Sequence, residues 1–190
     1  MKALEDKILS EGKVLPGNIL KVGSFLNQML DVPFIMSMGE EIARLFDGLG
    51  VTKILTIESS GISIAFAAGA KMNVPVVVAK KGKSKNVDGE IYSSQIYSFT
   101  HQKTYDVVVS KDYIGQADKV LIVDDFLAGG NALNGVIEML EQAGSTLAGC
   151  AVAIEKGFQG GGDKLREKGI KVEALALIDS MSDDSLTFRR

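Results

Sequence analysis

The chain has 190 residues, of which 46% are hydrophobic and 24% charged, and its formal net charge is −3. This composition is typical of an ordinary soluble protein of one domain. The acidic balance argues against general nucleic-acid binding, and no apolar run approaches the roughly 18 residues that a membrane helix needs. The one cysteine, Cys150, excludes an internal disulfide and fits a cytoplasmic location, and its apolar neighbours predict buried core rather than a nucleophile.

Two helices are predicted before the first central strand. Residues 2–11 place three apolar side chains on one helical face, and Gly12 can end that helix. Residues 14–27 contain a proline and two glycines, so we expect a loop or extended chain there. Asp31 can cap the second helix, with Pro33 in its first turn. The expected apolar positions are Leu4, Ile8 and Leu9 in the first helix and Phe34, Met38, Ile42, Leu45 and Phe46 in the second.

The first central strand leads into a polar turn that opens a helix. Residues 53–57 form a short apolar run, and residues 62–72 form a helix of small residues. Glu58, Ser59, Ser60 and Gly61 lie between them. Hydroxyl groups and a glycine at a helix N-terminus favour an anion site, although an ordinary serine-rich helix start is an equal alternative on this turn alone.

A basic segment follows the next predicted strand, residues 74–79. Lysines occupy positions 80, 81, 83 and 85. Such a run is more often a solvated surface, but beside an anion site it can close over a phosphate leaving group. Residues 91–100 and 104–109 are predicted to pair as a ribbon of two strands, with His101 as an exposed turn residue rather than a catalyst.

The strongest signal is a buried strand that ends in two carboxylates. The apolar run 120–123 indicates a strand covered on both faces, and Asp124 and Asp125 follow it. Gly129 and Gly130 then open a helix with apolar residues three and four apart. The glycines and the helix N-terminus favour a phosphate, while the carboxylates can accept hydrogen bonds from sugar hydroxyls or face a divalent cation. A solvated acidic edge is the alternative; a nucleotide hydrolase is disfavoured because the required Gly-x-x-x-x-Gly-Lys-Ser/Thr motif is absent.

The C-terminal part adds a second polar strand end. Residues 146–154 form a strand that finishes at Glu155, Lys156, Gly157 and Phe158. Lys156 can donate to an exocyclic oxygen of a base and Phe158 can pack on a ring, or both are ordinary surface and packing residues. A helix at 164–168, a strand at 170–178 and a frayed tail at 182–185 complete the chain. The alternation of strands and helices from 53 to 154 predicts an α/β fold with a mostly parallel sheet flanked by helices.

The segment from Asp124 to Ala132 resembles the phosphoribosyl-pyrophosphate (PRPP) signature of the type I phosphoribosyltransferases. It keeps the acidic pair, Ala128 and Gly130, and departs from the pattern at Gly129, Asn131 and Ala132. The lost hydroxyls imply that backbone N–H groups carry more of the phosphate binding. The order of motifs along nearly the whole chain is similar to that of the bacterial xanthine phosphoribosyltransferases.

This resemblance implies a type I phosphoribosyltransferase fold in a single domain, residues 1–190, with a small hood from about residues 12–30 and 155–185. It implies PRPP contacts by Ser59, Ser60, Gly61, Lys81, Asp124, Asp125, Ala128, Gly129, Gly130, Asn131 and Ala132, and base contacts by Leu20, Asn27 and Lys156. Lys80 and Lys83 remain alternatives to Lys81. No catalytic residue is assigned. The protein ligands of the metal stay unknown, since the resemblance implies that Mg²⁺ is carried by PRPP.

The implied reaction transfers the 5-phosphoribosyl group from PRPP to xanthine, giving xanthosine 5′-monophosphate and pyrophosphate in purine salvage. The resemblance also implies a homodimer, without nucleic-acid or membrane partners. Two alternatives stay open: a guanine or hypoxanthine phosphoribosyltransferase, and a PRPP-binding, purine-responsive regulator. The regulator is disfavoured because the residues before the first central strand lack a basic recognition helix.

Overall fold

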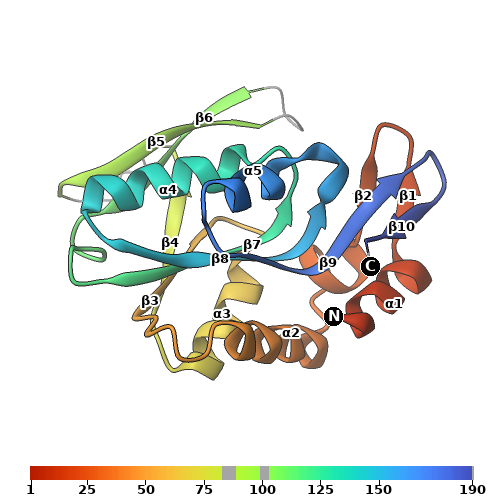
Figure 1. The fold of residues 1–190 in the computed structure, drawn as a ribbon, viewed down its shortest axis with the longest axis horizontal. Coiled ribbons are helices and arrows are strands. Elements are labelled where there is room, and N and C mark those ends of the chain that lie inside the picture. Colours follow the sequence, from red (N-terminus) through yellow and green to blue (C-terminus); the bar gives the residue numbers. More distant parts are fainter. Residues whose placement is uncertain (83–88, 99–102, 190) are drawn as a thin grey trace.

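An eight-stranded sheet forms the centre of the computed structural model, which describes residues 1–82, 89–98 and 103–189 (Figure 1). Its strands are β3 (Lys53–Ile57), β4 (Val76–Lys81), β5 (Ile91–Ser98), β6 (Lys103–Ser110), β7 (Lys119–Leu127), β8 (Thr146–Lys156), β9 (Val172–Met181) and β10 (Leu186–Phe188). The strand order is β10-β9-β8-β7-β3-β4-β6-β5, and the five strands from β9 to β4 run parallel. The remaining pairs, at both sheet edges, are antiparallel. The predicted mostly parallel α/β sheet is confirmed.

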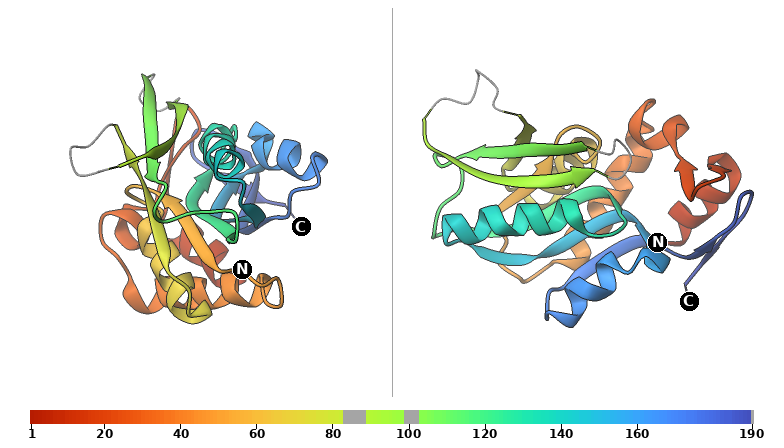
Figure 2. Two further views of the ribbon diagram at one scale, coloured as in Figure 1. Left: turned by 90° about the vertical axis from the view of Figure 1, so that its left-hand side faces the viewer. Right: turned by 90° about the horizontal axis from the view of Figure 1, so that it is seen from above.

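Helices cover both faces of this sheet (Figures 1 and 2). One face carries α2 (Val32–Leu45) and α3 (Ile62–Met72), and the other carries α4 (Asn131–Ala143) and α5 (Gly161–Glu167). Each face has its own apolar core. The N-terminal helix α1 (Lys2–Glu11) and the small hairpin of β1 (Lys13–Leu15) and β2 (Ile19–Lys21) lie beside β9 and β10 at one end of the sheet.

The helix that begins after Asp31 shows how the sequence specifies these elements. The Asp31 carboxylate accepts a hydrogen bond of 3.2 Å from the Phe34 N–H, which caps α2 as predicted. Met38 and Ile42 are fully buried on the inward face. A side chain at Gly39 would lie only 2.4 Å from the Ala67 carbonyl carbon of α3, so this glycine permits the close packing of α2 on α3.

Several predictions about single residues and segments were wrong. Leu9 is 60% exposed rather than packed with Leu4 and Ile8. Residues 14–27, predicted as loop or extended chain, are extended in the β1–β2 hairpin as expected, but they also contain a π-helical turn, Gly23–Asn27. The acidic pair does not end its strand, because β7 continues to Leu127 and pairs there with Glu155. The tail at 182–185 is not frayed, since it forms the turn between the paired strands β9 and β10, where the Ser182 N–H donates to the Ser185 carbonyl at 2.9 Å.

One prediction about burial is confirmed, and others concern residues that the structure does not describe. Cys150 is buried as expected, and burial raises the pKa of its thiol to about 12, which makes the reactive thiolate scarce at neutral pH. Lys83, Lys85 and the turn at His101 lie outside the described residues. Within the described parts, every helix is too short or too polar to cross a lipid bilayer.

Candidate active site

The carboxyl ends of β3, β4 and β7 bring three polar segments of the sequence into one cavity of about 350 Å³. Parallel strands end at the same sheet edge, where ligands of open α/β sheets bind. The cavity is lined by Ile57, Glu58, Ser59, Ser60, Lys81, Ile96, Tyr97, Tyr105, Val107, Asp124, Asp125 and Ala132. The serine turn, Lys81 and the acidic pair, which were each predicted separately, therefore meet at one place.

The two carboxyl groups of the acidic pair interact directly. Burial, together with the neighbouring Asp125 charge, raises the pKa of Asp124 well above its ordinary value. Burial also raises the pKa of Asp125, although hydrogen bonds with Asp124 and Asn27 oppose that rise. The Asp124 carboxylate also accepts a hydrogen bond of 2.9 Å from the Asp125 N–H. Desolvation and like charge therefore both disfavour the ionised form of Asp124.

The turn after β3 is built around Glu58 and Gly61. The Glu58 carboxylate accepts a hydrogen bond of 2.6 Å from the Lys81 N–H and pairs with the Lys80 ammonium at 3.1 Å. Burial raises the pKa of Glu58, but these two donors outweigh it and hold that pKa below its ordinary value. A side chain at Gly61 would lie 2.4 Å from the Thr56 hydroxyl and 2.8 Å from the Asp124 carboxylate, so only glycine fits there.

Both helix N-termini at this edge lack a capping side chain. Gly61 precedes α3, and Gly130, with a φ of 89°, precedes α4. That left-handed conformation favours glycine. Because neither N-cap residue makes a side-chain cap hydrogen bond, the partial positive charge at the starts of α3 and α4 stays available at the cavity edge.

The loop from β7 to α4, residues 128–132, is tied to its surroundings through atoms other than its N–H groups. The Ala128 carbonyl accepts a hydrogen bond of 3.1 Å from the Gly161 N–H, and the Gly130 carbonyl accepts one of 2.9 Å from the Asn134 side chain. The Asn131 side chain donates to the Tyr97 carbonyl of β5 at 3.3 Å. This loop therefore has a fixed backbone, and Asn131 links it to the β5–β6 ribbon.

The predicted base-contact residues do not line one common cavity. The Lys156 ammonium donates to the Asn18 carbonyl at 2.8 Å and lies 5.5 Å from the centre of the Phe126 ring, and burial lowers its pKa. Leu20 is buried, and with Asn27 it lines a separate cavity of about 450 Å³ on the N-terminal side. Asn27 is the connection between the two regions because its side chain also reaches Asp125.

Sequence reasoning missed four residues of this site. Tyr97 and Tyr105 line the cavity from the ribbon, and the Lys81 ammonium lies 6.0 Å from the Tyr105 ring centre. Asn18 and Phe126 contact Lys156. Phe158 is 37% exposed, and its contact with the base ring stays a prediction. The position of Phe126 could have been predicted from the sequence, because in a strand that continues past Asp125 the next side chain lies on the opposite face of the sheet.

Residues 33–174 match the family model described as a phosphoribosyl transferase domain. The chain belongs to the phosphoribosyltransferase family. It is 50% identical over 191 residues to a protein named xanthine phosphoribosyltransferase from Lachnoclostridium phytofermentans, covering 100% of this chain and 98% of that protein. It is 51% identical over 188 residues to a protein of the same name from Bifidobacterium adolescentis, covering 98% and 97%.

Solved structures show the same fold at lower identity. An adenine phosphoribosyltransferase from Giardia lamblia complexed with 9-deazaadenine superposes with a TM-score of 0.76 at 20% identity, over 92% of this chain and 96% of that one. One from Trypanosoma brucei in complex with AMP, pyrophosphate and ribose-5-phosphate gives a TM-score of 0.74 at 17% identity, over 90% and 78%. The predicted type I phosphoribosyltransferase fold is thus confirmed.

Proposed function

We propose that this chain transfers the 5-phosphoribosyl group from PRPP to xanthine, giving xanthosine 5′-monophosphate and pyrophosphate. The observation that carries this proposal is the meeting of the serine turn, Lys81 and the acidic pair in one cavity beside the loop 128–132. Each segment suits one part of PRPP. The names of the relatives that are 50% and 51% identical over almost their whole length support xanthine as the base.

The proposed catalysis depends on positioning and electrostatics. Backbone N–H groups of residues 128–132 bind the 5′-phosphate, and Asp124 and Asp125 accept hydrogen bonds from the ribose hydroxyls. As the bond to the leaving group breaks, negative charge grows on the diphosphate. Lys81 and the N–H groups at Ser60 and Gly61 stabilise that charge. No protein nucleophile takes part, and no side chain is assigned to remove the base proton.

We infer that Mg²⁺ enters the site with PRPP rather than as a resident ion. The described residues contain no group of three or more His, Cys, Asp or Glu side chains placed to hold a metal. The acidic pair alone fits a hard cation that keeps most of its other ligands from phosphate oxygens and water. When bound, the ion neutralises charge on the diphosphate.

A panel of bases assayed with Mg²⁺ and PRPP tests the proposed reaction. The Lys156 ammonium donates to a 6-oxo group and cannot accept from an adenine amino group, so nucleotide should form with xanthine in preference to adenine. A preference for guanine or hypoxanthine would favour the alternative transferase. Preference for adenine or orotate would contradict the base assignment, and PRPP-sensitive DNA binding without turnover would favour the regulator.

We propose that the hood over the base consists of about residues 12–30 and 155–185. The Met1 amino group donates to the Leu175 carbonyl of β9, and the Asn18 carbonyl accepts from Lys156. These contacts support a unit built from the two ends of the chain (Figure 1). A cytoplasmic location is also proposed, on the basis of the buried free thiol of Cys150.

We also propose a homodimer that forms through an apolar patch beside the serine turn. The patch consists of Met29, Leu30, Val32 and Phe66, which are 63%, 47%, 61% and 66% exposed. Leu30, Val32 and Phe66 of this patch line a cavity of about 510 Å³, which Ser59 and Ser60 also line. Exposed apolar clusters of this kind mark protein interfaces.

Phe66→Glu should convert the protein from dimer to monomer, because the new carboxylate would be desolvated in the interface. Sedimentation equilibrium measures the mass directly. Tyr113→Glu is the matched control, since Tyr113 is 60% exposed but lies on the cavity beside β4 and β6. A Phe66→Glu protein that stays dimeric, or a monomeric wild type, would show that the patch is not a subunit interface.

A further inference from the structure

We propose that the ion pair between the buried Glu155 and the half-buried Arg166 positions the loop 128–132 for the 5′-phosphate of the substrate. Neither residue touches the cavity that holds the acidic pair. The inference rests on the proposed function for the identity of the ligand. Its structural basis is a chain of close contacts from β8, through α5, to the loop.

The ion pair is unusually well satisfied for its depth. Glu155 is fully buried at the end of β8, and the Arg166 guanidinium meets its two oxygens at 2.9 Å and 2.6 Å. The same guanidinium donates to the Val172 carbonyl at 3.3 Å and 3.2 Å and to Asp163 at 3.2 Å. All five N–H donors of Arg166 are therefore used, and only arginine presents five donors in one plane.

This ion pair helps to hold the short helix α5 in place on the sheet. The helix α5 spans seven residues, from Gly161 to Glu167, and a helix of that length is not stable in isolation. Arg166 lies in its last turn and binds β8 and the start of β9. Arg166, together with the buried side chain of Leu165, thus anchors α5 on the sheet.

Two consecutive glycines transmit that position to the loop. A side chain at Gly162 would lie 2.0 Å from a Glu155 carboxylate oxygen, so the helix rests directly on the ion pair. A side chain at Gly161 would lie 2.2 Å from the Ala128 carbonyl oxygen and 2.6 Å from the Gly130 nitrogen. The Gly161 N–H also donates to the Ala128 carbonyl at 3.1 Å. A shift of α5 by a few tenths of an ångström would therefore move residues 128–130.

The base side of the site does not depend on this chain of contacts. Lys156 follows Glu155 directly, but its ammonium is held by the Asn18 carbonyl and lies beside the Phe126 ring. Those contacts come from the β1–β2 turn and from β7. Disturbing Arg166 should consequently weaken binding of the 5′-phosphate and leave binding of the base almost unchanged.

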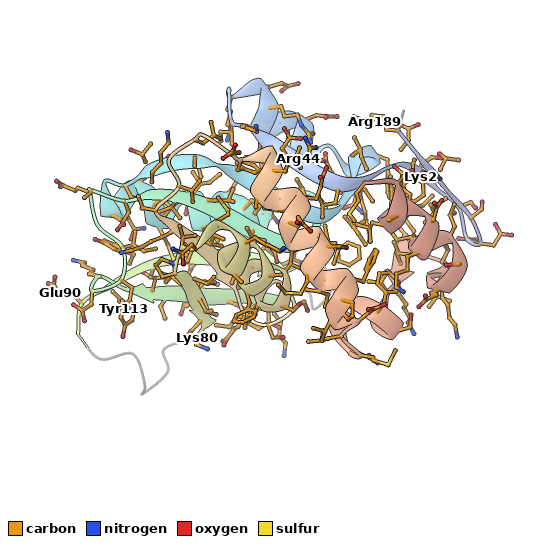
Figure 3. All side chains as sticks on the ribbon, turned by 90° about the horizontal axis from the view of Figure 1, so that it is seen from below. Lys2, Arg44, Lys80, Glu90, Tyr113 and Arg189 are labelled. Atoms are coloured by element: carbon orange, nitrogen blue, oxygen red, sulfur yellow. The ribbon has the colours of Figure 1, made fainter. Side chains whose placement is uncertain are left out.

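The test compares the affinity of a nucleoside 5′-monophosphate with that of the same nucleoside, xanthosine, by calorimetry. The dissociation constant of xanthosine divided by that of its 5′-monophosphate measures how much the phosphate group contributes to binding. Arg166→Lys keeps the charge but loses the planar pair, and it should reduce this ratio about tenfold, as expected for a weakened charge-assisted contact. Arg44→Lys is the control, because Arg44 forms the same two-bond pair with Glu41 on the exposed side of α2 (Figure 3).

A second variant reaches the loop without touching the ion pair. Gly161→Ala places a methyl group against Ala128 and should reduce the same ratio, while Gly115→Ala, where nothing lies within 4 Å, should not. In Arg166→Lys and in Gly161→Ala the KM for PRPP should rise, and the KM for xanthine should change by less than about twofold.

The outcomes separate the inference from the proposed function. A lower melting temperature in Arg166→Lys with an unchanged affinity ratio would mean that the pair only stabilises the fold, and would overturn the inference. Equal weakening of nucleoside and monophosphate in Gly161→Ala would overturn it as well. If the wild-type protein itself bound xanthosine as tightly as its 5′-monophosphate, the proposed function would fail, and the loop would have no phosphate to position.

Discussion

Asp124→Asn should remove most transferase activity and at the same time make the protein more stable to heat. The asparagine amide supplies a donor where the ribose diol needs an acceptor. Losing a hydrogen bond to a charged group should lower kcat/KM by roughly 10- to 100-fold. Stability should rise because the folded protein no longer has to accommodate an acidic group that burial and Asp125 hold above its ordinary pKa.

The stability effect should depend on pH in a defined direction. A carboxyl group whose pKa is higher in the folded state than in the unfolded state stabilises the fold at low pH and loses that contribution as pH rises through the folded pKa. The melting temperature of Asp124→Asn relative to wild type should therefore increase as the pH rises above about 4, where an ordinary aspartic acid titrates, by about 2–4 °C for each kcal/mol.

Thermal unfolding followed by calorimetry across this pH range checks the expectation. Asp47→Asn, at an exposed position after α2, is the control and should change neither activity nor melting temperature. A melting temperature of Asp124→Asn that stays at or below the wild-type value at every pH would show that burial and Asp125 do not raise the pKa of Asp124.

Lys156→Met should impair recognition of the base while leaving PRPP binding intact. Methionine keeps the length of the side chain beside Phe126 but cannot donate to a 6-oxo group. The kcat/KM for xanthine should fall roughly 10- to 100-fold, and the KM for PRPP should stay within about twofold of wild type. Lys168→Met, on the exposed surface after α5, is the matched control.

The pH profile adds a second reading of the same residue. Burial lowers the pKa of Lys156, so the wild-type enzyme should lose affinity for xanthine at a pH below the range in which ordinary lysines titrate. Lys156→Arg should retain its charge there. If Lys156→Met preferred xanthine over adenine by the same factor as wild type, the ammonium would have no role in base selection.

Much of the fold was predictable because its strands and helices follow simple apolar patterns. The helix at Ile62–Met72 has the predicted bounds, and the cap at Asp31 forms as expected. Strand β7 was predicted too short because charged residues rarely lie within central strands. Here the acidic pair lies near the carboxyl end of the central strand β7. Its carboxylates reach the cavity while its backbone continues to pair with β8.

The parts that sequence could not supply are those set by contacts between distant segments. Lys81 joins the acidic pair because β4 lies beside β3, and the ribbon adds Tyr97 and Tyr105 because β6 pairs with β4. The π-helical turn that ends at Asn27 has no compositional signature. Glu155 belonged to a predicted polar strand end, yet it is buried against Arg166, eleven residues further along the chain.

Crystals grown with Mg²⁺ and PRPP test the central claim most directly. The account predicts the 5′-phosphate on the N–H groups of residues 128–132, the ribose hydroxyls on Asp124 and Asp125, and the diphosphate between the serine turn and Lys81. A structure in which PRPP is bound elsewhere, with the loop 128–132 empty, would contradict it.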